Sequence, residues 1–187
     1  VGTMDAALSG SGVLALDAIA ARAGETSLAE LERRRLEAKV GDLATIMYTS
    51  GTTGTPKGIC FSHRNIVFKR FARALALPEI GEDDVFLCYL PLFHTFGRYL
   101  ELYGSIFWGA TYVALDNPSV EALVAGMRRW RPTVFISVPK KWMQIHEAIV
   151  READPDRVPD AEVADALKRI TGGRLRWGLS AAGHLDA

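Results

Sequence analysis

One segment of the chain concentrates the residue types that bind phosphate. Residues 48–58 read Tyr-Thr-Ser-Gly-Thr-Thr-Gly-Thr-Pro-Lys-Gly, a run of hydroxyl side chains and glycines with Lys57 near its end. Glycines let the backbone approach a ligand closely, successive N–H groups can form an anion-binding nest, and a lysine adds a mobile positive charge. A solvated turn between two strands has a similar composition, so residue types alone leave both interpretations open.

The spacing separates this segment from a Walker A loop, in which the lysine directly follows a glycine and precedes a helix. Here Lys57 lies three residues beyond Gly54 and is followed by Gly58 and the apolar run Ile59-Cys60-Phe61. Another apolar run, residues 43–47, precedes the segment. The pattern therefore predicts a loop that joins two strands as a hairpin.

Two further stretches follow in the chain. Residues 90–98 read Leu-Pro-Leu-Phe-His-Thr-Phe-Gly-Arg, and residues 175–183 read Leu-Arg-Trp-Gly-Leu-Ser-Ala-Ala-Gly. Together with residues 42–58, they resemble the motifs of the adenylate-forming (AMP-binding) superfamily, and most of all its long-chain fatty acyl-CoA synthetases. The resemblance covers residues 42–187 and is loose over residues 1–41.

The resemblance implies ATP-dependent activation of a carboxylic acid. In that family the carboxylate attacks the α-phosphorus of ATP, magnesium pyrophosphate leaves, and the CoA thiol then displaces AMP from the acyl-adenylate. The residues that would hold the β- and γ-phosphates are Thr49, Ser50, Gly51, Thr52, Thr53, Gly54 and Lys57, with Thr49 also reaching Mg²⁺. ATP, Mg²⁺ and CoA are thus the expected cofactor and co-substrates.

The same resemblance implies contacts for the acid and the adenylate. His94 would lie near the carboxylate, although a lone histidine near a helix start is as often a capping or solvent-facing residue. By the same resemblance, Ala181, Ala182 and Gly183 would flank the adenylate. They follow a predicted strand, and ligands of parallel sheets bind beyond the carboxyl ends of the strands. Relatives often carry Gly-Gly where this chain has Ala181-Ala182, and a tight turn explains the small residues equally well.

Length and composition limit the function. The family enzyme is several times longer than 187 residues, so we expect an internal fragment that ends before the adenine and magnesium motif and is inactive alone. The 22 basic and 22 acidic side chains balance, which argues against nucleic acid as a partner. Two alternatives remain: an aryl- or amino-acid adenylation domain that feeds a carrier protein, and a non-catalytic nucleotide-binding module.

Localisation follows from apolar runs and cysteines. No apolar run reaches the 18 or so residues of a membrane span, and no signal peptide is evident. Cys60 and Cys88 lie inside apolar runs, which predicts buried thiols in a reducing compartment. We therefore expect a cytoplasmic protein, with peripheral membrane association possible. The four histidines show no metal-ligand spacing.

Strand and helix patterns alternate after residue 42, which predicts an α/β fold with a mostly parallel sheet. Helices are expected over residues 63–77 and 93–108, and residues 1–41 are expected to be partly helical. The apolar positions predicted to face inward are Leu28, Leu31 and Leu36 in the first segment, and Ile66, Val67, Phe71, Ala74 and Leu75 in the helix over 63–77. Arg98 and Glu101 are expected to pair outside the apolar stripe of the helix over 93–108.

Overall fold

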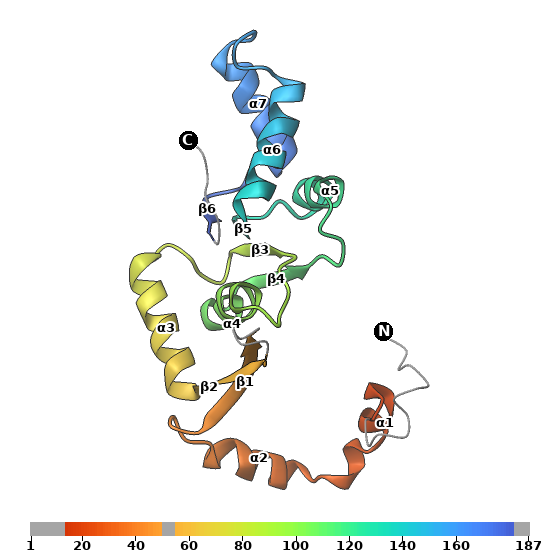
Figure 1. The fold of residues 1–187 in the computed structure, drawn as a ribbon, viewed down its shortest axis with the longest axis vertical. Helices are drawn as coiled ribbons and strands as arrows, with labels where there is room; N and C mark the ends of the chain where they lie inside the picture. The colour runs from red at the N-terminus through yellow and green to blue at the C-terminus, as the bar shows by residue number, and fades with distance from the viewer. Residues whose placement is uncertain (1–13, 50–54, 182–187) are drawn as a thin grey trace. The chain divides into compact units, whose positions relative to one another are not determined.

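The computed structural model describes residues 14–49 and 55–181. The chain divides into two compact units, Val1–Asp42 and Leu43–Ala187. The first contains α1 (Leu16–Ala21), a short 3₁₀ turn (Ala23–Glu25) and α2 (Leu28–Glu37). The second contains a hairpin, a four-stranded sheet and the helices that pack on it (Figure 1).

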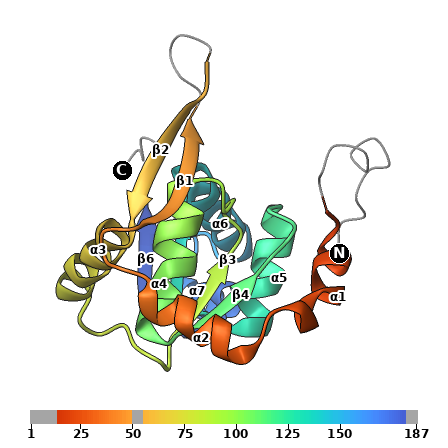
Figure 2. The same ribbon diagram turned by 90° about the horizontal axis from the view of Figure 1, so that it is seen from below.

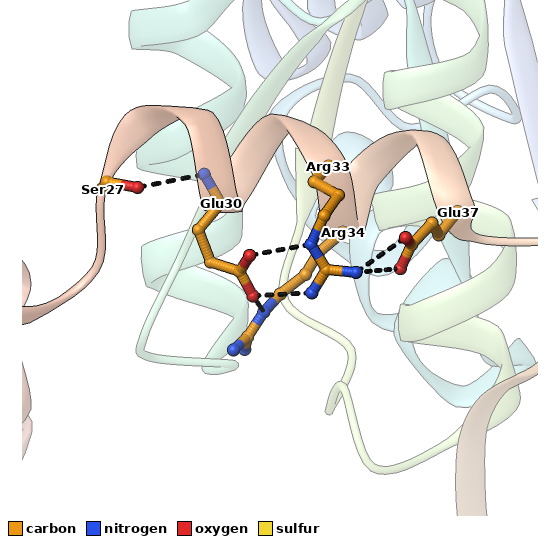
Figure 3. Close-up of polar contacts among 5 residues, drawn as sticks. All are labelled: Ser27, Glu30, Arg33, Arg34 and Glu37. Atoms are coloured by element: carbon orange, nitrogen blue, oxygen red, sulfur yellow. Dashed lines mark hydrogen bonds and ion pairs between the residues drawn. The ribbon is translucent and has the colours of Figure 1, made fainter.

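Helix α2 is stabilised by contacts within itself. The Ser27 hydroxyl caps its N-terminus by accepting from the Glu30 N–H at 3.1 Å. Arg33 pairs with both Glu30 and Glu37, as Figure 3 shows. The predicted inward positions of this helix are wrong, because Leu28, Leu31 and Leu36 are all exposed.

The phosphate-type segment lies at the end of a hairpin, as predicted. Strands β1 (Leu43–Thr49) and β2 (Lys57–Ser62) pair antiparallel, with Thr49 opposite Lys57 (Figure 2). Gly58 allows close packing between them: a Cβ at this position would lie 3.1 Å from Ile46 Cγ2.

The second sheet is wholly parallel in the described residues and has the strand order β4-β3-β5-β6. The strands are β3 (Val85–Cys88), β4 (Thr111–Ala114), β5 (Val134–Ser137) and β6 (Trp177–Ser180). The expected α/β fold with a mostly parallel sheet is therefore confirmed.

Helices cover both faces of this sheet (Figure 1). On one face α5 (Val120–Trp130), α6 (Pro139–Glu152) and α7 (Asp160–Thr171) form a core with Leu87 and Phe135. On the other face, Phe86, Val134 and Ile136 pack with Leu100. Alternate residues of each strand thus face opposite cores, as expected for a sheet covered on both sides. No helix among the described residues is long and apolar enough to cross a membrane.

Helix α3 (His63–Ala76) has the predicted bounds within a residue, and two of its predicted inward residues, Ile66 and Ala74, are partly buried. Ser62 and Asn65 form a capping box at its start. Val67, Phe71 and Leu75 are exposed, whereas Arg70 is 4% exposed. The helix therefore packs along the side that carries Arg70, which apolar periodicity does not reveal.

The predicted helix over 93–108 is two elements. A π-helix covers Phe96–Leu102, and α4 covers Tyr103–Trp108. The wider π turn rotates the side chains, so that Glu101 is completely buried rather than outside the apolar stripe. The predicted Arg98–Glu101 pair is wrong. The prediction of two buried cysteines is half wrong, because Cys88 is buried but Cys60 is exposed.

Candidate functional site

The hairpin pairs the two residues that flank the hydroxyl- and glycine-rich loop. Thr49 and Lys57 are directly opposite in the hairpin register, so their side chains emerge on the same face. No carboxylate pairs with Lys57 in the part of the chain that the structure describes. A hydroxyl and an ammonium on one face suit phosphate oxygens. Residues Ser50, Gly51, Thr52, Thr53 and Gly54 lie outside the described residues.

His94 lies in the exposed turn that follows β3. Its backbone N–H donates to the Pro91 carbonyl at 3.0 Å, and its Nδ1 accepts from the Phe96 N–H at 3.2 Å. Because Nδ1 accepts in this contact, a neutral His94 carries its proton on Nε2. The ring therefore presents an N–H donor, which is the group that a carboxylate accepts from.

Gly97 makes this turn possible. A Cβ at Gly97 would lie 2.5 Å from the Leu90 carbonyl oxygen and 2.6 Å from the Pro91 carbonyl oxygen. Real Cβ atoms do not approach backbone oxygens this closely, so only glycine fits without moving the chain. The glycine in the motif over 90–98 thus has a packing reason, which sequence reasoning did not identify.

Arg98 joins the His94 turn to the hairpin. Its Nη1 donates to Thr45 Oγ1 at 2.8 Å, and its Nε donates to the Leu92 carbonyl at 2.7 Å. On the other strand of the hairpin, the Phe61 ring lies 5.0 Å from the Tyr99 ring. These contacts therefore hold the β1–β2 hairpin against the segment that carries His94. Sequence reasoning assigned Arg98 to a helix-surface pair and missed this role.

The small-residue stretch begins at the carboxyl edge of the sheet. Ala181 directly follows β6, and its N–H donates to the Ser137 carbonyl at 3.3 Å. The Tyr89 and Ser137 hydroxyls share a hydrogen bond of 2.7 Å at the same edge. Burial raises the pKa of the Tyr89 phenol, which favours its neutral form. Ala182 and Gly183 lie outside the described residues.

Two of the sequence motifs, residues 90–98 and 175–183, meet the sheet at this carboxyl edge. The turn with His94 follows β3, and Ala181 follows β6, while β5 lies between these two parallel strands. Both stretches therefore leave the sheet at its carboxyl end, where ligands of open α/β sheets bind. The hydroxyl of Ser180 is buried there without a hydrogen-bond partner in the described part of the chain.

Glu101 is a buried acid beneath β3. Neither of its carboxyl oxygens makes a full hydrogen bond with a described residue. Burial raises the pKa of Glu101 to about 8, and a backbone contact from Leu90 offsets this only in part. Glu101 is thus largely protonated at neutral pH. The described residues contain no cluster of three or more His, Cys, Asp or Glu that could hold a metal ion.

The described residues supply two of the groups that a magnesium nucleotide needs, a hydroxyl and an ammonium. Mg²⁺ is commonly held by one or two protein oxygens, with phosphate oxygens and water completing the shell. The described part of the loop offers the Thr49 hydroxyl for the ion and Lys57 for the phosphates.

These observations define a class of α/β protein. Its members have a hydroxyl- and glycine-rich hairpin loop and a candidate ligand site at the carboxyl edge of a parallel sheet. Residues 4–187 match the family model described as AMP-binding enzyme. The chain therefore belongs to the AMP-binding enzyme family.

The curated relatives include long-chain acyl-CoA ligases. The chain is 31% identical over 174 residues to long chain acyl-CoA synthetase 7, peroxisomal, of Arabidopsis thaliana, covering 79% of this chain and 24% of that protein. It is 35% identical over 119 residues to long-chain-fatty-acid–CoA ligase 1 of Saccharomyces cerevisiae, covering 60% of this chain and 17% of the yeast protein. The chain thus spans less than a quarter of each relative's length.

Solved structures give the same fold and family. A malonyl-CoA ligase in a ternary product complex with methylmalonyl-CoA and AMP has a TM-score of 0.63 and 31% identity, covering 80% of this chain and 29% of that chain. The o-succinylbenzoate CoA synthetase of Bacillus subtilis, in complex with AMP, has a TM-score of 0.59 and 29% identity, covering 80% and 27%. These neighbours are acid–CoA ligases whose acids differ.

Proposed function

We propose that this chain is the phosphate- and acid-binding part of an ATP-dependent ligase that converts a long-chain fatty acid to an acyl-adenylate and then to acyl-CoA. The observation that carries the proposal is the placement of Thr49 and Lys57 on one face of a hairpin that Arg98 ties to the His94 turn. The similarity to two long-chain ligases supports the choice of acid.

Each residue's proposed role follows from its charge or its hydrogen-bonding group. Lys57 and the donors of residues 49–54 neutralise the β- and γ-phosphates, which stabilises the departing pyrophosphate. The Thr49 hydroxyl would hold Mg²⁺, which would supply further charge neutralisation on the phosphates. His94 donates from Nε2 to the carboxylate, holding it for attack on the α-phosphorus. Ala181, Ala182 and Gly183 flank the adenylate, with Ala181 anchored by its bond to the Ser137 carbonyl.

The ligase works on small molecules, namely ATP, a carboxylic acid and CoA, and has no nucleic-acid partner. Two free thiols, Cys60 and Cys88, support a reducing compartment such as the cytoplasm, with peripheral contact to membranes that contain the acid. Since the chain spans 24% or less of the two curated relatives, we propose that catalysis needs further protein segments. By family resemblance these supply a magnesium-binding glutamate, a ribose-binding aspartate and a lysine that acts on the adenylate.

Nucleotide binding by the chain itself is the first test. Lys57→Ala should weaken the binding of a fluorescent ATP analogue at least tenfold, since it removes the charge at the loop. Lys168→Ala is the matched control, because Lys168 is exposed in the last turn of α7, which leads into the start of β6 and not into its carboxyl end. Equal affinities for the two variants would contradict the assignment of Lys57.

Catalysis is tested in the longest reading frame that contains this chain. ATP–pyrophosphate exchange is measured with acetate, octanoate, palmitate, benzoate and amino acids. Exchange driven by palmitate supports the long-chain ligase, whereas exchange with benzoate or an amino acid identifies an adenylation domain for a carrier protein. No exchange with any acid favours a nucleotide-binding module. Acyl-CoA formation by the 187-residue chain alone would show that no further segment is needed.

A further inference from the structure

Trp142 lies outside the candidate contacts described above, yet it holds the strand that leads into one of them. The residue lies in the first turn of α6, and its indole Nε1 donates to the Leu179 carbonyl at 3.0 Å. Leu179 lies in β6, two residues before Ala181. Because a buried indole N–H needs a hydrogen-bond partner, this bond fixes both the ring and the end of the strand.

Trp142 also ends a row of aromatic side chains that crosses the sheet. Its ring meets the Phe135 ring edge-on, with centroids 5.1 Å apart, and the Phe135 ring stacks on the Tyr89 ring at 6.1 Å. Tyr89 directly follows β3 and begins the segment that carries His94. The row therefore connects the His94 segment to the strand that precedes Ala181.

Gly178 of β6 makes room for the indole ring. A Cβ at Gly178 would lie 2.9 Å from Cη2 and 3.1 Å from Cζ2 of Trp142. The indole cannot yield freely, because Phe135 packs against it and the Leu179 carbonyl binds its N–H. Close packing thus explains the glycine in the motif over 175–183, and it is one of the usual reasons for a glycine inside a strand.

We propose that Trp142 is a positioning residue for the adenylate. Through its contacts with Leu179 and Gly178 it sets the place of Ala181, from which the small-residue stretch continues, relative to the His94 turn. The inference rests on the proposed function, which assigns that stretch to the flank of the adenylate. A misplacement of about 1 Å can cost about a hundredfold in rate, so a side chain that supports a ligand contact from behind has a measurable effect.

The experiment compares two ligands by calorimetry, in the longest reading frame that contains this chain. AMP tests the adenylate contacts, whereas tripolyphosphate tests the phosphate loop. Trp142→Phe removes the N–H donor and the ring atoms nearest Gly178, so it should weaken AMP binding at least tenfold and change tripolyphosphate binding less than twofold. Trp130→Phe is the matched control, because Trp130 is 44% exposed at the end of α5, and it should leave both affinities unchanged.

Gly178 supplies a second variant, which disturbs the same contact from the strand. Gly178→Ala should also weaken AMP binding at least tenfold, because its Cβ displaces the ring. Phenylalanine leaves room for that Cβ, so Gly178→Ala should cost little more once Trp142→Phe is present. Fully additive losses in the double variant would contradict a shared contact. Urea denaturation checks that each variant is folded, and Gly178→Ala decides alone where Trp142→Phe is not.

The result is separable from that of the ligase proposal. If AMP binding depends on Trp142 but no acid drives pyrophosphate exchange, the ligase proposal fails and the positioning role stands. If palmitate drives exchange but the folded variants bind AMP as the parent does, the positioning role is refuted and the ligase stands. Equal losses of AMP and tripolyphosphate binding, or a parent that does not bind AMP, would also overturn the inference.

Discussion

Helix α2 and the region from α3 to α4 differ in the burial and pairing of their ionisable side chains. In α2, Arg33, Arg34 and Arg35 all pair with glutamates of the same helix, and all these groups are solvated. In the second region, Arg70 and Glu101 are buried and lack partners among the described residues. Paired surface charges contribute little to stability and indicate no ligand. Buried ionisable groups without partners cost stability, whether charged, as Arg70 is, or protonated, as Glu101 largely is at neutral pH, and they therefore call for a functional explanation.

The largest expected effect is the pH dependence caused by Glu101. Its pKa is about 8 in the folded chain and about 4.5 when solvated. Between these values the folded state binds more protons than the unfolded state, so stability is highest at low pH and falls as pH rises through 8. Between pH 5.5 and 8.5 the free energy of unfolding should fall by about 3 kcal/mol.

Urea denaturation at several pH values measures this effect. Glu101→Gln should remove most of the slope and make the chain more stable than the parent at pH 8.5. Glu82→Gln, at an exposed position, is the control and should keep the slope. An equal slope in the parent and in Glu101→Gln would show that another group is responsible.

A smaller effect is expected where a charge does have partners. Arg98→Met removes the hydrogen bonds to Thr45 and the Leu92 carbonyl, and it should lower the free energy of unfolding by about 2 kcal/mol. It should also weaken ATP binding, because the hairpin is no longer tied to the His94 turn. Thr45→Val leaves the Leu92 bond intact and should cost about 1 kcal/mol. If the two variants have fully additive effects, Arg98 and Thr45 are not coupled.

The smallest effect belongs to α2. Arg33→Ala breaks two solvated ion pairs and should leave the denaturation midpoint of the sheet-containing unit unchanged. Circular dichroism of the variant should show at most a small loss of helix. A clear shift of the midpoint would mean that α2 contributes to the stability of residues 43–187 and would weaken the contrast between the two regions.

Local sequence patterns correctly predicted the elements that depend on residues close together in the sequence. Alternating strand and helix signals identified the parallel sheet, and the apolar runs on either side of residues 48–58 identified the hairpin. Ser62 caps α3 through Asn65, three residues away, which is the kind of contact that local sequence determines.

The errors lie where distant residues decide the outcome. Gly97, in the first turn of the π-helix, packs against the Leu90 and Pro91 carbonyls, and helical periodicity carries no information about that contact. The predicted buried face of α3 was correct in part, since Ile66 and Ala74 are partly buried, but it missed Arg70 between them because it counted only apolar residues as inward. The Thr45–Arg98 hydrogen bond joins residues 53 positions apart, which no local pattern encodes.

The register of the hairpin has an entropic consequence. Ordering a flexible loop around a ligand requires its ends to come together, and that closure costs free energy in proportion to the freedom lost. Here β1 and β2 hold Thr49 opposite Lys57 through strand pairing alone. Folding has therefore already met the closure cost, and more of the interaction energy with a bound phosphate is left to appear as affinity.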